Sequence, residues 1–260
     1  MINRFIIALS FLTLLPLKQK RIDEKELVSS VVFFPAVGFI EGILSFALSY
    51  ALMQTFPSSI VSLILLLFFL ITRGILHLDG LSDTFDAFFY KSTGDREKDL
   101  ERRLEIMKDS SVGVAGVVAL VFAILCKFIL FKEILDMKQY LIFIFTFCLS
   151  RWIIIPLMYS GKPARKTGLG FLFIGKIKLR QLFLSTLLPL ILFLYFVVYE
   201  KYIFLVASLL IIFLIFLFLK KLFEKFFNGI TGDNLGATVE IMEIAFLISF
   251  ISFERIWLST

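Results

Sequence analysis

The sequence predicts an all-α integral membrane protein, a polytopic bundle of about seven spanning helices with a further short membrane helix at the N-terminus. Two observations predict this class. Hydrophobic residues make up 59% of the 260 residues and the mean hydropathy is +0.95, whereas a water-soluble domain carries roughly 45 to 50% apolar residues. The apolar residues also fall in long runs, and no soluble domain or low-complexity linker interrupts them. We therefore expect residues 1–260 to form a single integral membrane domain.

The first apolar run, Phe5 to Leu17, is short for a membrane crossing. Arg4 precedes it, as in a signal peptide, but no small-x-small cleavage site follows before the charged residues begin. We expect a short interfacial or half-inserted helix, and the sequence leaves open whether residues 5–17 span the membrane.

Each later run approaches the ~20 residues needed to cross ~30 Å of hydrocarbon. These runs are Val28 to Leu52, Ile60 to Leu78, Val112 to Phe131, Tyr140 to Tyr159, Leu182 to Tyr199, Tyr202 to Leu219 and Ala237 to Leu258.

The connections between the runs alternate in charge. Lys and Arg are concentrated in the connections at residues 18–26, 79–109, 161–180 and 220–236. The other connections, residues 53–59, 132–139 and 200–201, hold only Lys132, Lys138 and Lys201. Basic loops are retained on the cytoplasmic side of a membrane, so we expect the first set to face the cytoplasm. This placement accounts for the net charge of +6 without a nucleic-acid partner.

The sharpest polar cluster is HLDGLSDTFD, from His77 to Asp86. On a helix Asp79, Asp83 and Asp86 lie at i, i+4 and i+7, within about 60° of arc. Carboxylates that share a face repel one another unless a cation is bound, and oxygen-only ligands favour Mg²⁺ or Mn²⁺ over zinc. We therefore predict a divalent-metal site, with a solvated acidic helix end as the alternative.

The only histidine, His77, lies two residues before Asp79 and therefore nearly on the opposite helix face. Direct metal ligation is not expected there. We group His77 with the three aspartates as a catalytic candidate that contacts a substrate phosphate, and a structural role is the alternative.

A second cluster precedes the 112–131 run and contains Arg102, Arg103, Lys108, Asp109, Ser110 and Ser111. The two serines suit the N-cap of the following helix. The cations and the exposed amides of a helix N-terminus also suit a phosphate. The sequence thus favours either a helix cap or an anion site at this point of the chain.

A third set comes from the other cytoplasmic ends. It consists of Arg73, Arg151, Arg165, Lys166, Asp233, Glu240 and Glu243. Under the expected topology Arg73, Arg151, Glu240 and Glu243 lie at the same membrane depth as the aspartates, which favours a single site. We expect Lys127 and Arg255 to reach the opposite headgroups and to have no function. Glu41, close to mid-membrane, needs a partner that the sequence does not identify.

Carboxylates, a divalent metal and many cations at a membrane surface indicate chemistry on a pyrophosphate. The metal neutralises developing charge, the cations hold the leaving group, an alcohol attacks phosphorus, and a spare aspartate can act as general base. The residues alone thus predict a membrane phosphotransfer enzyme.

The chain also resembles the cobalamin synthases, or adenosylcobinamide-GDP ribazoletransferases. The resemblance rests on HLDGLSDTFDAF at 77–88, RRLEIMKDSSVGVAG at 102–116, ARKTGLG at 164–170 and TGDNLGATVEIMEI at 231–244. It implies a transferase of vitamin B12 biosynthesis in the prokaryotic cytoplasmic (inner) membrane, with its active site facing the cytoplasm. The implied reaction joins adenosylcobinamide-GDP to α-ribazole or its 5′-phosphate and releases GMP.

Carried onto this sequence, the resemblance implies roles for single residues. The implied Mg²⁺ ligands are Asp79, Asp83 and Asp86, with further candidates in Asp109, Asp233, Glu240 and Glu243. The implied phosphate ligands are Arg73, Arg102, Arg103, Lys108, Arg151, Arg165 and Lys166.

Two alternatives remain. A CDP-alcohol phosphatidyltransferase uses similar chemistry, but its DGxxAR signature departs from the Asp79-Gly80-Leu81-Ser82-Asp83 order found here. A cation- or proton-coupled transporter also buries charged residues, but near the bilayer midplane. The sequence does not distinguish a monomer from a homo-oligomer.

Overall fold

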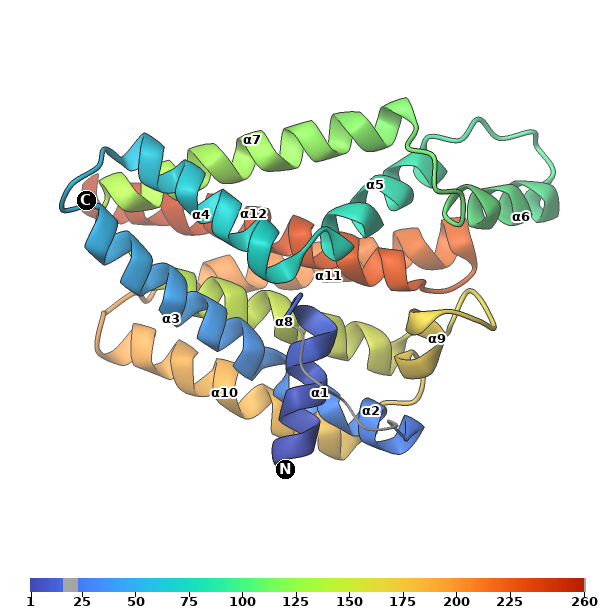
Figure 1. Cartoon of the computed structure of the whole chain (residues 1–260), viewed down its shortest axis with the longest axis horizontal. Helices are drawn as coiled ribbons and strands as arrows, with labels where there is room; N and C mark the ends of the chain where they lie inside the picture. The colour runs from blue at the N-terminus through green and yellow to red at the C-terminus, as the bar shows by residue number, and fades with distance from the viewer. Residues whose placement is uncertain (16–22, 260) are drawn as a thin grey trace.

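The computed structural model describes residues 1–15 and 23–259, and over these ranges the regular structure is helical (Figure 1). The helices are α1 (Ile2–Leu12), α2 (Glu24–Ser30), the 3₁₀ turn η1 (Val31–Phe33), α3 (Phe34–Leu52), α4 (Ser58–Arg73), α5 (Leu76–Phe88), α6 (Arg96–Ile106), α7 (Val114–Asp136), α8 (Ile142–Ser160), α9 (Leu169–Phe173), α10 (Leu179–Val198), α11 (Leu205–Phe227) and α12 (Gly232–Ser259). The predicted all-α class is confirmed.

Six helical segments of the described chain are long and apolar enough to cross a membrane. They are Glu24–Leu52, Val114–Asp136, Ile142–Ser160, Leu179–Val198, Leu205–Phe227 and Gly232–Trp257. A seventh crossing is possible if α4 and α5 are counted together, so the number predicted from hydropathy agrees with the structure.

The prediction of one continuous helix from Ile60 to Leu78 is wrong. Helix α4 ends at Arg73, and α5 leaves it at an angle of 92°. Gly74 forms the break with φ of +68° and ψ of −158°, a region that is essentially restricted to glycine. The aspartates of the 77–86 segment therefore lie on a separate helix whose direction is set by this break.

Helix α1 is a short apolar helix, as expected for an interfacial element. It packs against α2 and α3, and it runs across the start of α3 in Figure 1. Beyond its end, the backbone N–H of Leu14 donates to the carbonyl of Thr72 at 2.8 Å. Residues 16–22, which include the end of the predicted 5–17 run and part of the first basic connection, lie outside the described residues.

The connections gather at two ends of the bundle. The segment from α5 through α6 to α7, helix α9, and the turn between α11 and α12 lie at one end (Figure 1). The α3–α4, α7–α8 and α10–α11 turns and the C-terminus lie at the other. Because the first group carries the Lys- and Arg-rich segments, we call this end of the bundle the basic end. The basic and the less basic connections thus lie at opposite ends, as the sequence predicts.

Helices α8 and α12 form the centre of the bundle. Most residues of α8 and α12 are buried inside the structure, whereas few residues of α10 are. Helix α3 approaches α8 closely because Gly38 and Gly42 face it, and an added Cβ at either position would overlap the α8 backbone. The outer helices instead expose Leu, Ile and Phe side chains, as expected for surfaces in contact with lipid.

Candidate active site at the basic end

Helix α5 carries the three predicted aspartates. Asp79 is exposed and Asp83 is partly buried, and neither side chain has a hydrogen-bond or ion-pair partner among residues 1–15 and 23–259. Asp83 interacts electrostatically with the carboxylates of Asp79, Asp86 and Asp233. The aspartates of α5 thus lie within electrostatic range of one another, and Asp233 joins them from the first turn of α12. Their role as metal ligands stays a prediction.

Two features bring Asp233 to this group. Thr231 and Asn234 exchange hydrogen bonds at the start of α12, which fixes the first turn of this helix. The absence of a side chain at Gly80 lets α5 approach the backbone of Asp233, since an added Cβ would lie 2.6 Å from its carbonyl oxygen. Arg165, the nearest cation, pairs with Asp233 at 3.3 Å and donates to the carbonyl of Leu104 at 3.0 Å.

Asp86 has a different environment from the other two aspartates. Its carboxylate accepts hydrogen bonds from the backbone N–H groups of Gly113 and Gly116, each at 2.8 Å. These amides belong to the N-terminus of α7, whose N-cap residue is Gly113. The expectation that Ser110 or Ser111 caps this helix is therefore wrong, because the cap is supplied by a residue from another helix.

Asp79, Asp83 and Asp233 offer carboxylate oxygens alone, which is a donor set that fits Mg²⁺ or Mn²⁺. No group of three or more His, Cys, Asp or Glu side chains within the described ranges is arranged to hold a metal ion as it stands. A bound cation would therefore have to draw these side chains together.

Asp109 is exposed between α6 and α7, where a hydrogen bond from the Ser111 backbone lowers the pKa of its carboxyl group.

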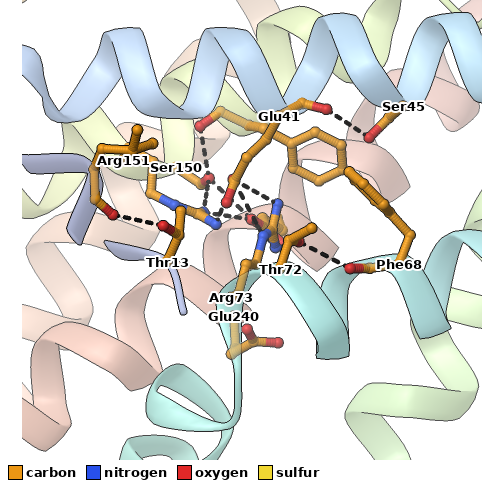
Figure 2. A network of polar contacts seen from close by, with 12 residues as sticks. Thr13, Glu41, Ser45, Phe68, Thr72, Arg73, Ser150, Arg151 and Glu240 are labelled. Carbon is orange, nitrogen blue, oxygen red and sulfur yellow. Dashed lines mark hydrogen bonds and ion pairs between the residues drawn. The ribbon is translucent and has the colours of Figure 1, made fainter. Parts of the chain in front are cut away.

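Glu240 and Glu243 lie instead in a buried ion cluster with Glu41, Arg73, Lys127 and Arg151. Arg73 and Arg151 both bind Glu41, at 3.0 and 2.9 Å, and both bind Glu243, at 3.0 and 2.7 Å. Figure 2 shows Glu41, Arg73, Ser150 and Arg151 pointing toward one another. The guanidinium groups and carboxylates are thus occupied by one another, so their predicted phosphate and metal roles stay predictions without support from this geometry.

Lys127 completes the cluster, contrary to its predicted place near the headgroups. Its ammonium group lies 2.6 Å from both Glu240 and Glu243, and the residue is only 6% exposed. The expectation that Lys127 reaches the headgroups is wrong because two acidic side chains on α12 hold it inside. Arg255 is exposed and pairs with Glu133, in line with an outer position.

His77 lies between the ion cluster and the aspartates. It lines a small cavity together with Arg73, Lys127 and Glu240, and it also lines a larger cavity of about 210 Å³ that includes Arg165 and Asp233. His77 is buried whereas Asp79 is exposed, so the two residues occupy different faces of α5, as the sequence predicts.

The other predicted phosphate ligands have varied environments. Arg103 donates to the carbonyl groups of Ala87, Phe88 and Tyr90 and so caps the end of α5. Arg102 pairs with Glu105 at 3.0 Å on the exposed face of α6. Lys108 and Lys166 are exposed at the basic end. Of the predicted phosphate ligands, Arg165 is the cation that the structure pairs with the aspartate group.

Comparison with known proteins agrees with the resemblance seen in the sequence. Residues 4–251 match the family described as cobalamin-5-phosphate synthase. The chain is 61% identical over 259 residues to a protein of Thermodesulfovibrio yellowstonii named adenosylcobinamide-GDP ribazoletransferase, with 100% of both chains covered.

More distant relatives carry the same name. The identity is 34% to a protein of Clostridioides difficile and 35% to one of Fusobacterium nucleatum, each aligned over 95% of this chain and 96% of the relative. No solved structure matches the chain. Both the extent and the identity of these matches favour this family over the phosphatidyltransferase and transporter alternatives, and the chain therefore belongs to the cobalamin-5-phosphate synthase family.

Proposed function

We propose that this protein joins adenosylcobinamide-GDP to α-ribazole or α-ribazole 5′-phosphate and releases GMP, with the reaction taking place at the cytoplasmic surface of a prokaryotic inner membrane. The observation that carries the proposal is the group of Asp79, Asp83 and Asp233 at the basic end. Asp79 and Asp83 form no ion pair among the described residues, whereas the carboxylates of the buried ion cluster are paired.

In the proposed reaction, the 3′-hydroxyl oxygen of the acceptor forms a bond to the phosphorus next to cobinamide. The bond from this phosphorus to the bridging oxygen breaks, and GMP leaves with that oxygen. A bound Mg²⁺ supplies neutralisation of the charge on the pyrophosphate. Asp79 and Asp83 would hold the ion, and Arg165 lies where it can bind a phosphate oxygen. The hydroxyl proton passes to a carboxylate oxygen of the same group.

The first test is GMP release by the purified, detergent-solubilised protein. Adenosylcobinamide-GDP and α-ribazole 5′-phosphate are supplied together and singly, with Mg²⁺ and with EDTA. Release that requires both substrates and the metal supports the proposal. Release without an acceptor would indicate a hydrolase, and undiminished release in EDTA would refute the metal requirement.

Asp83→Asn tests the aspartate group itself. The substitution removes a negative charge with almost no change in volume, so we expect a folded protein with turnover reduced at least 100-fold. Asp136→Asn is the matched control because Asp136 lies at the end of α7, at the opposite end of the bundle. Wild-type turnover by Asp83→Asn at saturating Mg²⁺ would contradict the assignment.

A further inference from the structure

A basic hollow lies where the start of α1, helix α2 and the turn leading into α10 meet, and we call it the α10 hollow. Its volume is about 780 Å³. Figure 1 shows the N-terminal end of α1 beside the start of α10. The described residues of its lining do not include Asp79, Asp83 or Asp233, so the proposed phosphoryl chemistry does not use this hollow.

Positive charge dominates the lining of the α10 hollow, where five cationic side chains meet two carboxylates. Lys176 and Glu24 pair with each other, so Asp23 is the carboxylate that remains. The other four cations are Arg4, Lys25, Lys178 and Arg180, and none of them forms an ion pair with a described residue. Since like charges brought together repel one another, an anion bound among them would stabilise this arrangement.

The hollow lies at the depth of the lipid headgroups. Helix α10 has 20 residues, and at 1.5 Å per residue its length equals the ~30 Å thickness of the hydrocarbon. Its first residue, Leu179, therefore lies at one boundary of the hydrocarbon, next to Lys178 and Arg180. Helix α1, which carries Arg4, is a short apolar helix of 11 residues, and its length suits the same interface.

An apolar surface continues from the cations into the membrane. Val28, Val32 and Leu184 line the hollow itself. Exposed apolar side chains then follow at helical spacing on the face of α10 that carries Arg180, namely Phe183, Leu187, Leu190 and Leu194. A molecule whose anionic group lay among the cations would thus place its hydrocarbon chain along α10.

We propose that the α10 hollow binds the phosphate group of an anionic phospholipid, with one acyl chain lying along the exposed face of α10. Basic pockets at the ends of membrane helices are a recurring means of binding such lipids. The inference rests on α10 crossing the membrane and not on the proposed reaction. A lipid in this place would join α1 and α2 to α10, because Arg4, Lys25 and Arg180 come from these three helices.

A soluble phosphate ester is the competing ligand. It offers the same phosphate chemistry to the four cations, but it has no hydrocarbon chain to cover Leu184 and the apolar face beyond it. The position of the hollow at the start of a membrane-spanning helix therefore favours the lipid.

Native mass spectrometry of the full chain in detergent, titrated with palmitoyl-oleoyl phosphatidylglycerol, measures the affinity for a single bound lipid. Phosphatidylcholine with the same acyl chains is the reference, because its choline group cancels the charge of the phosphate. We expect the wild type to bind phosphatidylglycerol about tenfold more tightly than phosphatidylcholine. The double variant Lys178→Gln/Arg180→Gln should lose most of this preference.

Lys220→Gln/Lys221→Gln is the matched control, since it removes the same charge from α11 at residues that do not line the hollow. This control should keep the wild-type preference to within about twofold, because solvent and salt screen more distant charges. A second variant, Ser29→Glu, adds a carboxylate to the lining and removes no cation. It should weaken binding of phosphatidylglycerol about tenfold and leave that of phosphatidylcholine nearly unchanged.

Three results would overturn the inference. Equal affinity of the wild type for the two lipids would show that the hollow does not recognise the charge of the headgroup. An equal loss of preference in the α11 control would assign the effect to the net charge of the basic end. Displacement of bound phosphatidylglycerol by an equal concentration of inorganic phosphate would identify a site for soluble phosphate instead of a lipid.

Discussion

Asp86 and Asp83 lie three positions apart on the same helix, yet their environments predict different consequences of substitution. Asp86 caps α7 through the amides of Gly113 and Gly116, whereas Asp83 has no such partner among the described residues. Asp86→Ala, which removes both acceptor oxygens, should therefore lower the free energy of unfolding by about 1 kcal/mol, the usual cost of losing a helix cap. Thermal unfolding of both variants in detergent measures the contrast. Unfolding of Asp86→Ala at the wild-type midpoint would show that the cap contributes nothing.

Asp99 gives the α5–α6 connection a pH dependence. Its carboxylate accepts hydrogen bonds from Ser92 and from the amide and hydroxyl of Thr93, and these bonds lower its pKa to about 2. An aspartate in an unfolded chain has a pKa of about 3.9. The ionised form is thus favoured in the folded state, so this contribution is complete well above pH 4 and is lost as the pH falls toward 2.

The measurement is the difference in unfolding midpoint between wild type and Asp99→Asn from pH 7 to pH 2.5. Wild type should be the more stable at pH 7, and the difference should shrink below pH 4. A difference that stays constant over this range would show that the ionisation of Asp99 is not responsible.

At the level of elements, the break between α4 and α5 sets the direction of the helix that carries the aspartates. Gly74→Ala places a side chain in a backbone region that costs about 1 to 3 kcal/mol for other residues, and the new Cβ would also overlap Leu14. We expect lower stability together with a loss of turnover per folded molecule. Gly94→Ala is the control, because Gly94 also has a positive φ, of +90°, but no atom lies within 4 Å of its Cβ position. Equal turnover in the two variants would show that the break does not orient the site.

The sequence predicted the elements that local composition determines and missed those set by distant contacts. Apolar runs and alternating basic connections located the spanning helices because lipid requires long apolar segments. Gly74 gave no such signal, since glycine is common in continuous membrane helices. Spacing along one helix was enough to group Asp79 with Asp83. The partners of Glu41 and Lys127 come from helices that are distant in the sequence, so only the folded structure identifies them.

At the level of the whole molecule, the buried ion cluster joins five helices with balanced charge. Glu41, Glu240 and Glu243 face Arg73, Lys127 and Arg151, and each of these residues is at most 6% exposed. Removing one member of a buried pair leaves an uncompensated charge and costs about 3 to 5 kcal/mol, whereas removing both members together costs much less. Stability should therefore follow the charge balance more closely than the number of ion pairs.

Lys127→Met and Glu240→Gln test this balance as single variants and as a pair. Lys127→Met alone leaves Glu240 without its cation, so the unfolding midpoint in detergent should fall by several degrees. The double variant is neutral again and should recover most of that loss. Lys132→Met is the matched control on the same helix, because its pair with Asp136 is exposed and exposed pairs contribute about 0 to 1 kcal/mol. A double variant as unstable as Lys127→Met would mean that the individual contacts, rather than the balance of charge, hold these helices together.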